Sequence, residues 1–446
     1  MKVAICYETT KKGELVARRK LVSVFLLLCI MVLLLSPWAD APSPSSVPVA
    51  VQQGGAQTVQ EPEEAEEISR ITIEAALEEQ EFRALSNMND DFVFRHPDIQ
   101  VELRRISPEN AYETYRTASE LEEAADVMLF RNEWVAEFAS SGYLHPADAA
   151  FAGKALGEQF EALSAPLKWN GYLWGVPRDM DPYVLVWNAE LLRAWLGEEA
   201  EFPLTGEQWA AAAAGAETEE ANGAYWFAVD GQDPYALLAW LENYAQERTD
   251  GLWEQDDEPW EETARGQAMA LLEEKRDRVR FGRDVREALS AGNALAGVLP
   301  YSEAEELVSR EGSGEQAEFK LAIDHHSWNL PYIWPRGSSF VISSRTEAEE
   351  AAGVWIADMT GEQAQLLHME EQGKLPVFRS LYDVDRRLSN LLPGRSGQAF
   401  PNQAPLLSGP DAVRELDRLG ELWGEFSGGQ LTWEEWQEAW ESGTGD

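Results

Sequence analysis

Cysteine is almost absent from this chain. Its 446 residues include two, Cys6 and Cys29, and both lie near the N-terminus. The rest of the sequence therefore offers no disulfide bond, no thiolate nucleophile and no cysteine-based metal site.

Histidines and the motifs of several enzyme classes are also scarce. The five histidines are scattered, apart from the adjacent pair His325 and His326, and adjacent residues do not share a helix face. No HExxH motif is present, so the pattern gives no support for a zinc site. The absence of GxSxG, P-loop and GxGxxG motifs removes support for a nucleophile elbow, a phosphate cradle and a dinucleotide-binding fold.

Basic residues are strongly outnumbered. The chain has 36 lysines and arginines against 79 aspartates and glutamates, a formal net charge of −43. A negative field of this size repels the phosphates of nucleic acids, so we expect no nucleic-acid partner. An apolar content of 44% and 18 tryptophans nevertheless indicate folded cores, and the length suffices for two lobes.

The first forty residues differ in kind from the rest. Arg18–Lys20 precede an uncharged apolar run, Leu21–Leu35, as in the n- and h-regions of a secretory signal. This run spans roughly 22 Å as a helix, less than the ~30 Å hydrocarbon core, although adding Ser36–Trp38 leaves an uncleaved anchor open. Ala39–Ala41 offers a small-x-small cleavage site. Residues 1–40 therefore predict export, to an extracellular or cell-surface, membrane-associated location.

Residues 41–67 have the composition of a tether. They are rich in Pro, Ser, Gln, Gly and Glu, and such a segment buries too little apolar surface to order itself. We therefore predict a disordered link between the N-terminal segment and the globular part.

Strands and helices alternate from residue 68 onward. Period-two patterns predict strands at 68–77 and 99–103, and the residues 126–130 read as a short, fully buried strand. Helical patterns predict helices at 78–95 and 111–123. This order predicts right-handed parallel crossovers in a three-layer α/β lobe, whose ligand edge lies beyond the strand C-termini. Beyond residue 192 the second lobe reads as mostly helical, with a turn and buried strand at 292–299 and a strand at 319–323. Capping boxes are predicted at Thr205, Ser302, Thr346 and Thr432, and a cap at Thr360.

The stretch Ala165–Leu192 organises this pattern. Asn170-Gly171 suits a tight hairpin turn, and Leu173–Val176 is an apolar strand that ends at Pro177. After a polar break, a second apolar strand, Tyr183–Trp187, leads to Asn188, which can cap a helix. Strand, polar crossing, strand and helix in this order are typical of a chain that leaves one lobe and enters another.

This stretch resembles the crossover "dGKlYGVP…D…vLyYNkdLf" of bacterial extracellular solute-binding proteins, the maltodextrin-binding-like family of ABC importers. The matching residues are Trp169–Pro177, Asp181, Val184–Asn188 and Glu190–Leu192. Weaker similarities follow in order: the segment from Gly292 to Tyr301 resembles "G.aAm…w", Gly337–Ser343 resembles the return strand "GG…aIsk", and Leu375-Pro376 resembles "G.lPa".

The resemblance implies a type II periplasmic-binding-protein-like α/β fold with a ligand cleft between two lobes. Lobe 1 is expected in residues 68–177 and 338–375, and lobe 2 in 178–337 and 376–446. It implies a monomer without enzymatic activity or cofactor that captures a solute, with a sugar or oligosaccharide favoured, and delivers it to ABC permease subunits. Family members are often lipoproteins, but Cys29 follows Leu26–Leu28 and lacks the small residue usual before the lipidated cysteine.

Sugar sites combine aromatic rings with carboxylates, amides and guanidinium groups. Alignment with the family gives the ligand-binding candidates Glu81, Phe130, Arg131, Trp134, Asp179, Asp181, Tyr183, Tyr301 and Trp334. Two other readings stay open. Asp179 and Asp181 could form the carboxylate pair of a secreted glycoside hydrolase, although a D-x-D pair on an extended segment points both groups the same way. The same fold could instead serve a sensor or adhesion module.

The three crossings between lobes suggest hinges, because each has Pro or Gly near it. We hypothesise that stiffening Gly337 and Ser338 together weakens ligand binding and leaves the fold intact.

Overall fold

The structure is a computed structural model that describes residues 68–147, 158–198, 200, 203–218, 221–246, 260–312, 320–325, 334–389, 391, 400–405 and 407–443. All of them belong to one compact unit, Glu66–Asp446. The predicted signal segment, its cleavage site, Cys29 and the tether lie outside the described residues. Among the helices within these ranges, none is long and apolar enough to cross a bilayer.

Lobe 1 is built on a six-stranded sheet with the order β2-β1-β3-β13-β4, with β7 also paired to β13. β1 runs parallel to β2 over eight residue pairs, from Ser69 opposite Ile99 to Ala76 opposite Ile106. The return strand β13 runs antiparallel to β3. The bounds are β1 Ser69–Ala76, β2 Ile99–Ile106, β3 Val127–Arg131, β4 Leu144–His145, β7 Val176–Pro177 and β13 Ser338–Ser343.

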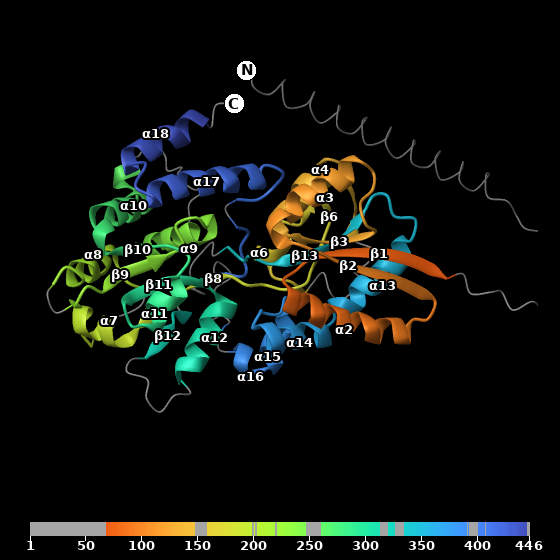
Figure 1. Cartoon of the computed structure of the whole chain (residues 1–446), viewed down its shortest axis with the longest axis horizontal. Coiled ribbons are helices and arrows are strands. Elements are labelled where there is room, and N and C mark those ends of the chain that lie inside the picture. The colour runs from red at the N-terminus through yellow and green to blue at the C-terminus, as the bar shows by residue number, and fades with distance from the viewer. Residues whose placement is uncertain are drawn as a thin grey trace, which may run out of the picture. The chain divides into compact units, whose positions relative to one another are not determined.

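Helices cover both faces of this sheet (Figure 1). α2 and α13 lie on one face, and α3 and α4 lie on the other. Their bounds are α2 Glu79–Arg95, α3 Ala111–Glu120, α4 Val135–Ser140 and α13 Glu349–Met359. The alternation of strand and helix predicted between residues 68 and 130 is thus confirmed, and it produces the expected three-layer α/β lobe.

Lobe 2 is built on a five-stranded sheet with the order β10-β9-β11-β8-β12. Helices still make up more of this lobe than strands do, as expected, but two of the five strands were not predicted. β8 Tyr183–Asn188, β11 Ala294–Pro300 and β12 Leu321–Ile323 fall in predicted strands, whereas β9 Tyr225–Val229 and β10 Val279–Phe281 were missed. β9 is the continuous apolar run YWFAV, which a buried parallel strand shares with a buried helix segment, so periodicity alone does not identify it.

Each face of the lobe 2 sheet has its own core. One core contains tryptophans from several helices, each at most 1% exposed: Trp209, Trp240, Trp423 and Trp436. The other lies under α11, α12, α15 and α16. The helices of this lobe are α7 Ala189–Leu196, α8 Gly206–Gly215, α9 Pro234–Ala245, α10 Ala264–Glu274, α11 Val285–Ser290, α12 Tyr301–Gly312, α15 Arg379–Val384, α16 Arg386–Ser389, α17 Ala412–Ser427 and α18 Trp433–Gly443.

Several remaining elements are short or connect the lobes. They are the 3-10 turns η1 Pro108–Asn110, η2 Asn132–Trp134, η5 Trp260–Glu262 and η6 Arg276–Arg278, with α6 Glu161–Ser164, α14 Glu362–Gln372 and the hairpin β5 Lys168–Trp169 to β6 Tyr172–Leu173. The hairpin turn has positive φ at Asn170 and Gly171, 50° and 82°, as the predicted tight turn requires.

Three of the capping predictions are confirmed and three were wrong. Asn188 accepts from the backbone of Glu190 and Leu191, and Thr205 forms a complete capping box with Gln208. Thr432 and Glu435 also bond each other reciprocally. Three predictions were wrong: α12 already begins at Tyr301, the cap residue of α13 is Ala348 rather than Thr346, and that of α14 is Gly361 rather than Thr360.

Candidate ligand cleft and crossing network

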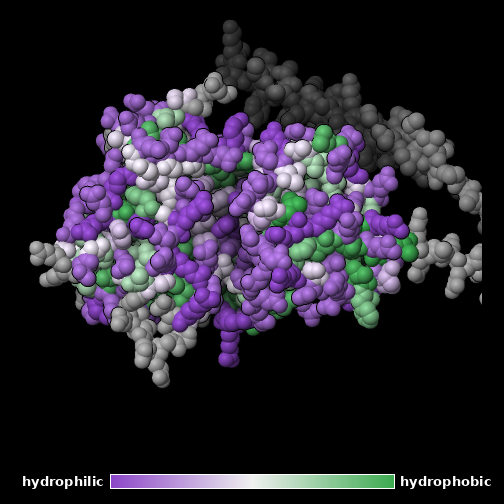
Figure 2. Space-filling model, viewed as in Figure 1, coloured by the Kyte–Doolittle hydropathy of each residue, from purple (hydrophilic) through white to green (hydrophobic). Residues whose placement is uncertain are grey.

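A cleft of about 530 Å³ has walls from both lobes. Lobe 1 contributes Arg131, Glu133 and Trp134. Lobe 2 contributes the turn between β9 and α9, the turn between β10 and α11, the segment that leads into β13, and α17. The residues are Asp230, Gln232, Asp233, Pro234, Tyr235, Arg283, Arg336, Val413, Leu416 and Asp417. Figure 2 shows mostly hydrophilic side chains around the hollow between the lobes.

The lobe 1 wall follows the C-terminal end of β3. The chain turns there into η2, so that three of four successive residues reach the ligand edge of the sheet. The Arg131 guanidinium lies 5.6 Å from the centre of the Trp134 ring, a cation–π contact. Glu133 is 4% exposed, and one of its carboxylate oxygens has no partner among the described residues.

The lobe 2 wall follows the C-terminal end of β9. Asp233 caps α9, because its carboxylate accepts from the backbone N–H of Tyr235 at 2.9 Å, and Pro234 occupies the first turn, where proline is favoured. Gln232 accepts a hydrogen bond of 3.0 Å from Arg283. These contacts hold carboxylate, amide and guanidinium groups together at one edge of the sheet.

An aromatic stack lies beneath these polar groups. The rings of Tyr183 and Tyr235 are stacked with centres 6.2 Å apart, and Trp334 packs on Tyr235 at 5.6 Å. The Tyr183 hydroxyl donates to Asp233, and the Tyr235 hydroxyl donates to Glu133 across the cleft. Burial, together with the neighbouring carboxylates, raises the pKa of both tyrosines well above the ordinary value, so both stay protonated donors.

Two carboxylates of the cleft have raised pKa values. Burial raises the pKa of Asp230, and the charge of Asp233 adds to the effect. Burial likewise raises the pKa of Asp417, with a further contribution from Glu421. Such groups accept hydrogen bonds from hydroxyls readily, because they are poorly solvated by water.

The structure brings some of the predicted ligand residues to this cleft. Arg131 and Trp134 line it, and Tyr183 and Trp334 belong to the aromatic stack under it. Phe130 is 1% exposed and packs in the lobe 1 core against Tyr115, Trp134 and Phe138, although it borders a second, small hollow beside Arg131. Tyr301 opens α12 and lies in the core on the opposite face of the lobe 2 sheet, where burial raises its pKa to about 12.

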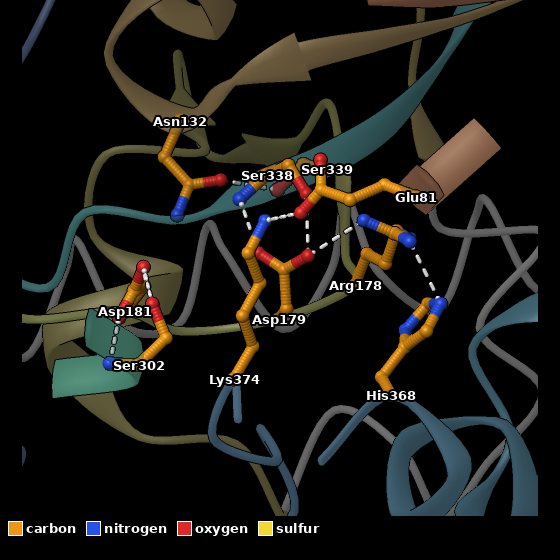
Figure 3. A network of polar contacts seen from close by, with 10 residues as sticks. All are labelled: Glu81, Asn132, Arg178, Asp179, Asp181, Ser302, Ser338, Ser339, His368 and Lys374. Carbon is orange, nitrogen blue, oxygen red and sulfur yellow. Dashed lines mark hydrogen bonds and ion pairs between the residues drawn. The ribbon is translucent and has the colours of Figure 1, made fainter. Parts of the chain in front are cut away.

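The three predicted carboxylates lie elsewhere, in a network that joins the crossings between lobes (Figure 3). Asp179 accepts from the backbone N–H and the hydroxyl of Ser338, at 3.0 and 2.9 Å, and from Arg178 at 2.7 Å. Burial alone raises the pKa of Asp179, but the charges of Lys374 and Arg178 outweigh it and hold the pKa below its usual range. Asp179 is thus an ionised anchor rather than a lining residue of the cleft.

Asp181 binds the start of α12 in the same manner. Its two oxygens accept from the backbone N–H of Ser302 at 2.9 Å and from the Ser302 hydroxyl at 2.8 Å. This explains why Ser302 forms no capping box: a carboxylate from a distant segment supplies the acceptor at the helix N-terminus. Because both aspartates have their oxygens engaged, they do not form the open carboxylate pair that a glycosidase requires.

Glu81 and Lys374 complete the network. Lys374 Nζ lies 2.5 Å from the Glu81 carboxylate. Burial lowers the Lys374 pKa, but the charges of Asp179 and Glu81 together outweigh burial and raise the pKa above its usual value. Arg178 lies 2.7 Å from His368 Nε2. Since arginine only donates, that nitrogen accepts, and His368 is neutral; burial and the Arg178 charge lower its pKa to about 2.

Gly337 sits against this network, which changes the hinge hypothesis. A Cβ at Gly337 would lie 2.4 Å from the carbonyl oxygen of Asp179, and Ser338 is bound to the Asp179 carboxylate. Stiffening both positions therefore disturbs packed structure, and we no longer expect such a variant to leave the fold intact.

The sequence-based reading missed most of the lobe 2 wall. Asp233-Pro234-Tyr235 carried a usable signal, since Asp followed by Pro is a typical helix start. No local pattern distinguishes Asp417 or Arg283 from the many other charged residues. Within the described ranges, no group of three or more His, Cys, Asp or Glu side chains could hold a metal ion.

Known structures share this architecture. The GacH receptor of Streptomyces glaucescens, solved unliganded and with acarbose, matches with 18% identity and a TM-score of 0.64 over 83% of this chain and 96% of its own. The sugar-binding protein MalE of Xanthomonas citri is 18% identical, with a TM-score of 0.64, over 83% of this chain and 95% of its own. An ABC transporter solute-binding protein of Thermotoga lettingae, bound to α-D-tagatose, is 17% identical, with a TM-score of 0.64, over 83% of this chain and 97% of its own. No curated protein sequence matches this chain significantly.

These likenesses show the two-lobed α/β fold of maltose-binding-protein-like proteins, as the sequence predicted. At the level of sequence, the profile of the family described as bacterial extracellular solute-binding protein matches residues 75–366. This match takes in most strands of both sheets and the cleft-lining residues from Arg131 to Arg336, and it covers well over half of the chain. The chain therefore belongs to the bacterial extracellular solute-binding proteins.

Proposed function

We propose that this protein captures a carbohydrate in the cleft between its lobes and delivers it unchanged to the permease of an ABC importer. The observation that carries the proposal is the lining of the cleft: acceptors and donors of both charge signs line it together with Tyr235, whose ring packs on Tyr183 and Trp334. Sugars present hydroxyl edges to polar groups and apolar C–H faces to aromatic rings.

The ligands of structural relatives support this choice of solute. GacH was solved with acarbose, the Thermotoga lettingae protein with α-D-tagatose, and a solute-binding protein of Agrobacterium vitis with D-mannitol. These ligands differ in size, but all carry many hydroxyl groups. We assign the direct contacts to Arg131, Glu133, Trp134, Asp230, Asp233 and Asp417, with Tyr183 and Trp334 supporting Tyr235 from below.

The mode of delivery follows from the family and the N-terminal pattern. We propose that residues 1–40 export the chain, that residues 41–67 tether it near the membrane, and that the folded part acts as a monomer without enzymatic activity. The lobe boundaries at 177/178, 337/338 and 375/376 are part of this proposal, because the crossing network joins those three places.

Thermal unfolding of the chain from residue 41 in the presence of single saccharides tests the proposal. Maltotriose, acarbose, D-tagatose and D-mannitol are suitable probes. At a concentration 100 times the dissociation constant, a bound probe adds about 2.7 kcal/mol to the free energy of unfolding, which raises the midpoint by a few degrees. Mass spectrometry of the recovered sugar distinguishes capture from hydrolysis, since a cleaved product contradicts the proposal.

A further inference from the structure

Arg336 has an unusual backbone conformation. Its φ is 23°, a positive value that residues with a Cβ rarely adopt. Such strain persists only where the surroundings fix the conformation, and it is concentrated at functional sites. Arg336 lies in the crossing between Trp334 of lobe 2 and β13 of lobe 1, and it lines the cleft.

The backbone of Arg336 is held from both sides by the crossing network. Its carbonyl oxygen accepts a 2.6 Å hydrogen bond from the backbone N–H of Asp181. The following residue, Gly337, lies so close to Asp179 that no side chain fits. Ser338, one residue further, is bound to the Asp179 carboxylate by two hydrogen bonds. The two anchoring aspartates therefore determine where the Arg336 side chain starts.

The guanidinium group lies on the aromatic stack and keeps free donors. Its centre is 5.4 Å from the centre of the Tyr183 ring, and Nη1 donates to the Tyr183 hydroxyl at 3.1 Å. Among the described residues, no other hydrogen bond or ion pair of this side chain is found. Burial lowers the Arg336 pKa, but Tyr183, Asp181 and Asp233 outweigh it and raise the pKa, so the group stays charged.

We propose that Arg336 is a specificity-determining residue of the cleft, which selects ligands with two neighbouring oxygen atoms for its planar fork of donors. In a saccharide these are vicinal hydroxyl oxygens. The strained backbone aims the guanidinium at the floor of the cleft, where the Tyr183 ring supports it. This inference rests on the proposed function and deepens it, because it names the part of the sugar that one residue reads.

Binding to three variants tests the selective role. Arg336→Ala and Arg336→Gly remove the fork, and Arg336→Lys keeps the charge without the planar pair of donors. With maltotriose, D-tagatose and D-mannitol as probes in isothermal titration calorimetry, we expect all three variants to lose about tenfold or more in affinity, since a lost charged hydrogen bond has that magnitude. The surface variant Arg345→Ala, which removes a guanidinium bound to Glu122 outside the cleft, should bind within about twofold of wild type.

The unliganded variants test the positioning independently. Glycine adopts φ of 23° without strain, whereas alanine retains the strain, so Arg336→Gly should unfold a few degrees above Arg336→Ala. In unstrained positions glycine is instead the less stable of the two. A merely structural role of the side chain would not give this order together with a loss of binding.

The outcomes separate this inference from the proposed function. If wild type binds a probe and both Arg336→Ala and Arg336→Gly bind it equally well, the inference is overturned and carbohydrate capture stands. If Arg336→Lys binds like wild type, charge rather than the fork suffices, and the inference is again overturned. If wild type binds none of the probes, carbohydrate capture fails for them. In that case the unfolding midpoints still test the positioning of Arg336. A midpoint of Arg336→Gly that is no higher than that of Arg336→Ala overturns it.

Discussion

The hydroxyl group of Tyr235 in lobe 2 donates a hydrogen bond to the carboxylate of Glu133 in lobe 1. This contact joins the two walls of the cleft directly, between a residue at the start of α9 and one in η2. Tyr235, which packs on Tyr183 and Trp334, is thus hydrogen-bonded to a residue of the opposite lobe. The relative position of the lobes and the shape of the aromatic stack are therefore linked.

Tyr235→Phe should weaken sugar binding and leave the fold intact. Phenylalanine retains the ring contacts with Tyr183 and Trp334, but the buried Glu133 carboxylate loses its hydroxyl donor. A buried acceptor left without a partner costs about 1–3 kcal/mol, and this penalty opposes closure of the lobes. We expect affinity to fall about tenfold or more in calorimetry, with little change in circular dichroism. Equal affinity of the variant and wild type would argue against a role of this contact in binding.

Asp179→Asn should destabilise the folded protein strongly. The substitution leaves Arg178 and Lys374 buried beside a neutral group, and breaking a buried ion pair in this way costs about 3–5 kcal/mol. Urea unfolding measures the loss. Asp411→Asn is the matched control, because Asp411 pairs with Arg414 at side-chain exposures of 63% and 77%, where a pair contributes about 1 kcal/mol or less. Similar losses in both variants would contradict the anchoring role of Asp179.

His368 should make the protein less stable in mild acid. Its pKa in the folded protein is lowered to about 2, against 6.5 ordinarily. Below pH 6.5 the unfolded chain binds a proton that the folded chain does not, so stability falls with decreasing pH by up to about 1.4 kcal/mol per pH unit. The contribution is present in full above pH 6.5.

Urea unfolding of wild type and His368→Gln between pH 5 and 7 measures this contribution. We expect the difference in free energy between the two proteins to change with pH in favour of the variant as the pH falls. The difference is the useful quantity because other groups add slopes of their own, such as Glu242, whose pKa burial raises to about 8. Parallel curves would show that His368 does not titrate on unfolding in this range.

Gly337→Ala should be destabilising because of the space it fills. The new Cβ meets the Asp179 carbonyl oxygen at 2.4 Å and the Asn132 amide at 3.1 Å, so the crossing must shift. We expect a loss of about 1–3 kcal/mol, as for overpacked cores. Gly424→Ala in α17 is the opposite case: nothing lies within 4 Å of its Cβ, and the change should stabilise the helix by about 0.5–1 kcal/mol. A Gly337→Ala protein as stable as wild type would contradict the close packing of this crossing.

The sequence allowed a good prediction of elements whose causes are local. Asn188 and Thr205 cap the helices that follow them because their partners are two or three residues away. The resemblance at the crossover then supplied the two-lobed fold. In lobe 2 the local pattern did not identify every strand. The apolar run of β9 is a strand because it pairs with β10 and β11, which are distant in the sequence.

The site was harder to predict, because its partners are distant in the chain. Asp179 and Ser338 are 159 positions apart, and Asp181 and Ser302 are 121 apart. In an acidic chain no pattern separates an aspartate that anchors a crossing from one that faces a ligand. Arg131 and Trp134 were found because they follow a recognisable buried strand, whereas Asp417 on α17 reaches the cleft only through the folding of the C-terminal helices.

The spacing of the two aspartates has a mechanical consequence. Asp179 is fastened to Ser338 at the start of β13, which belongs to lobe 1, and Asp181 is fastened to Ser302 in α12, which belongs to lobe 2. Only Met180 lies between them, and its backbone exchanges two hydrogen bonds with Leu375 of another crossing, at 3.0 and 2.8 Å. The point anchored to lobe 1 and the point anchored to lobe 2 are thus separated by a single residue, and the backbone of that residue is itself tied to a second crossing.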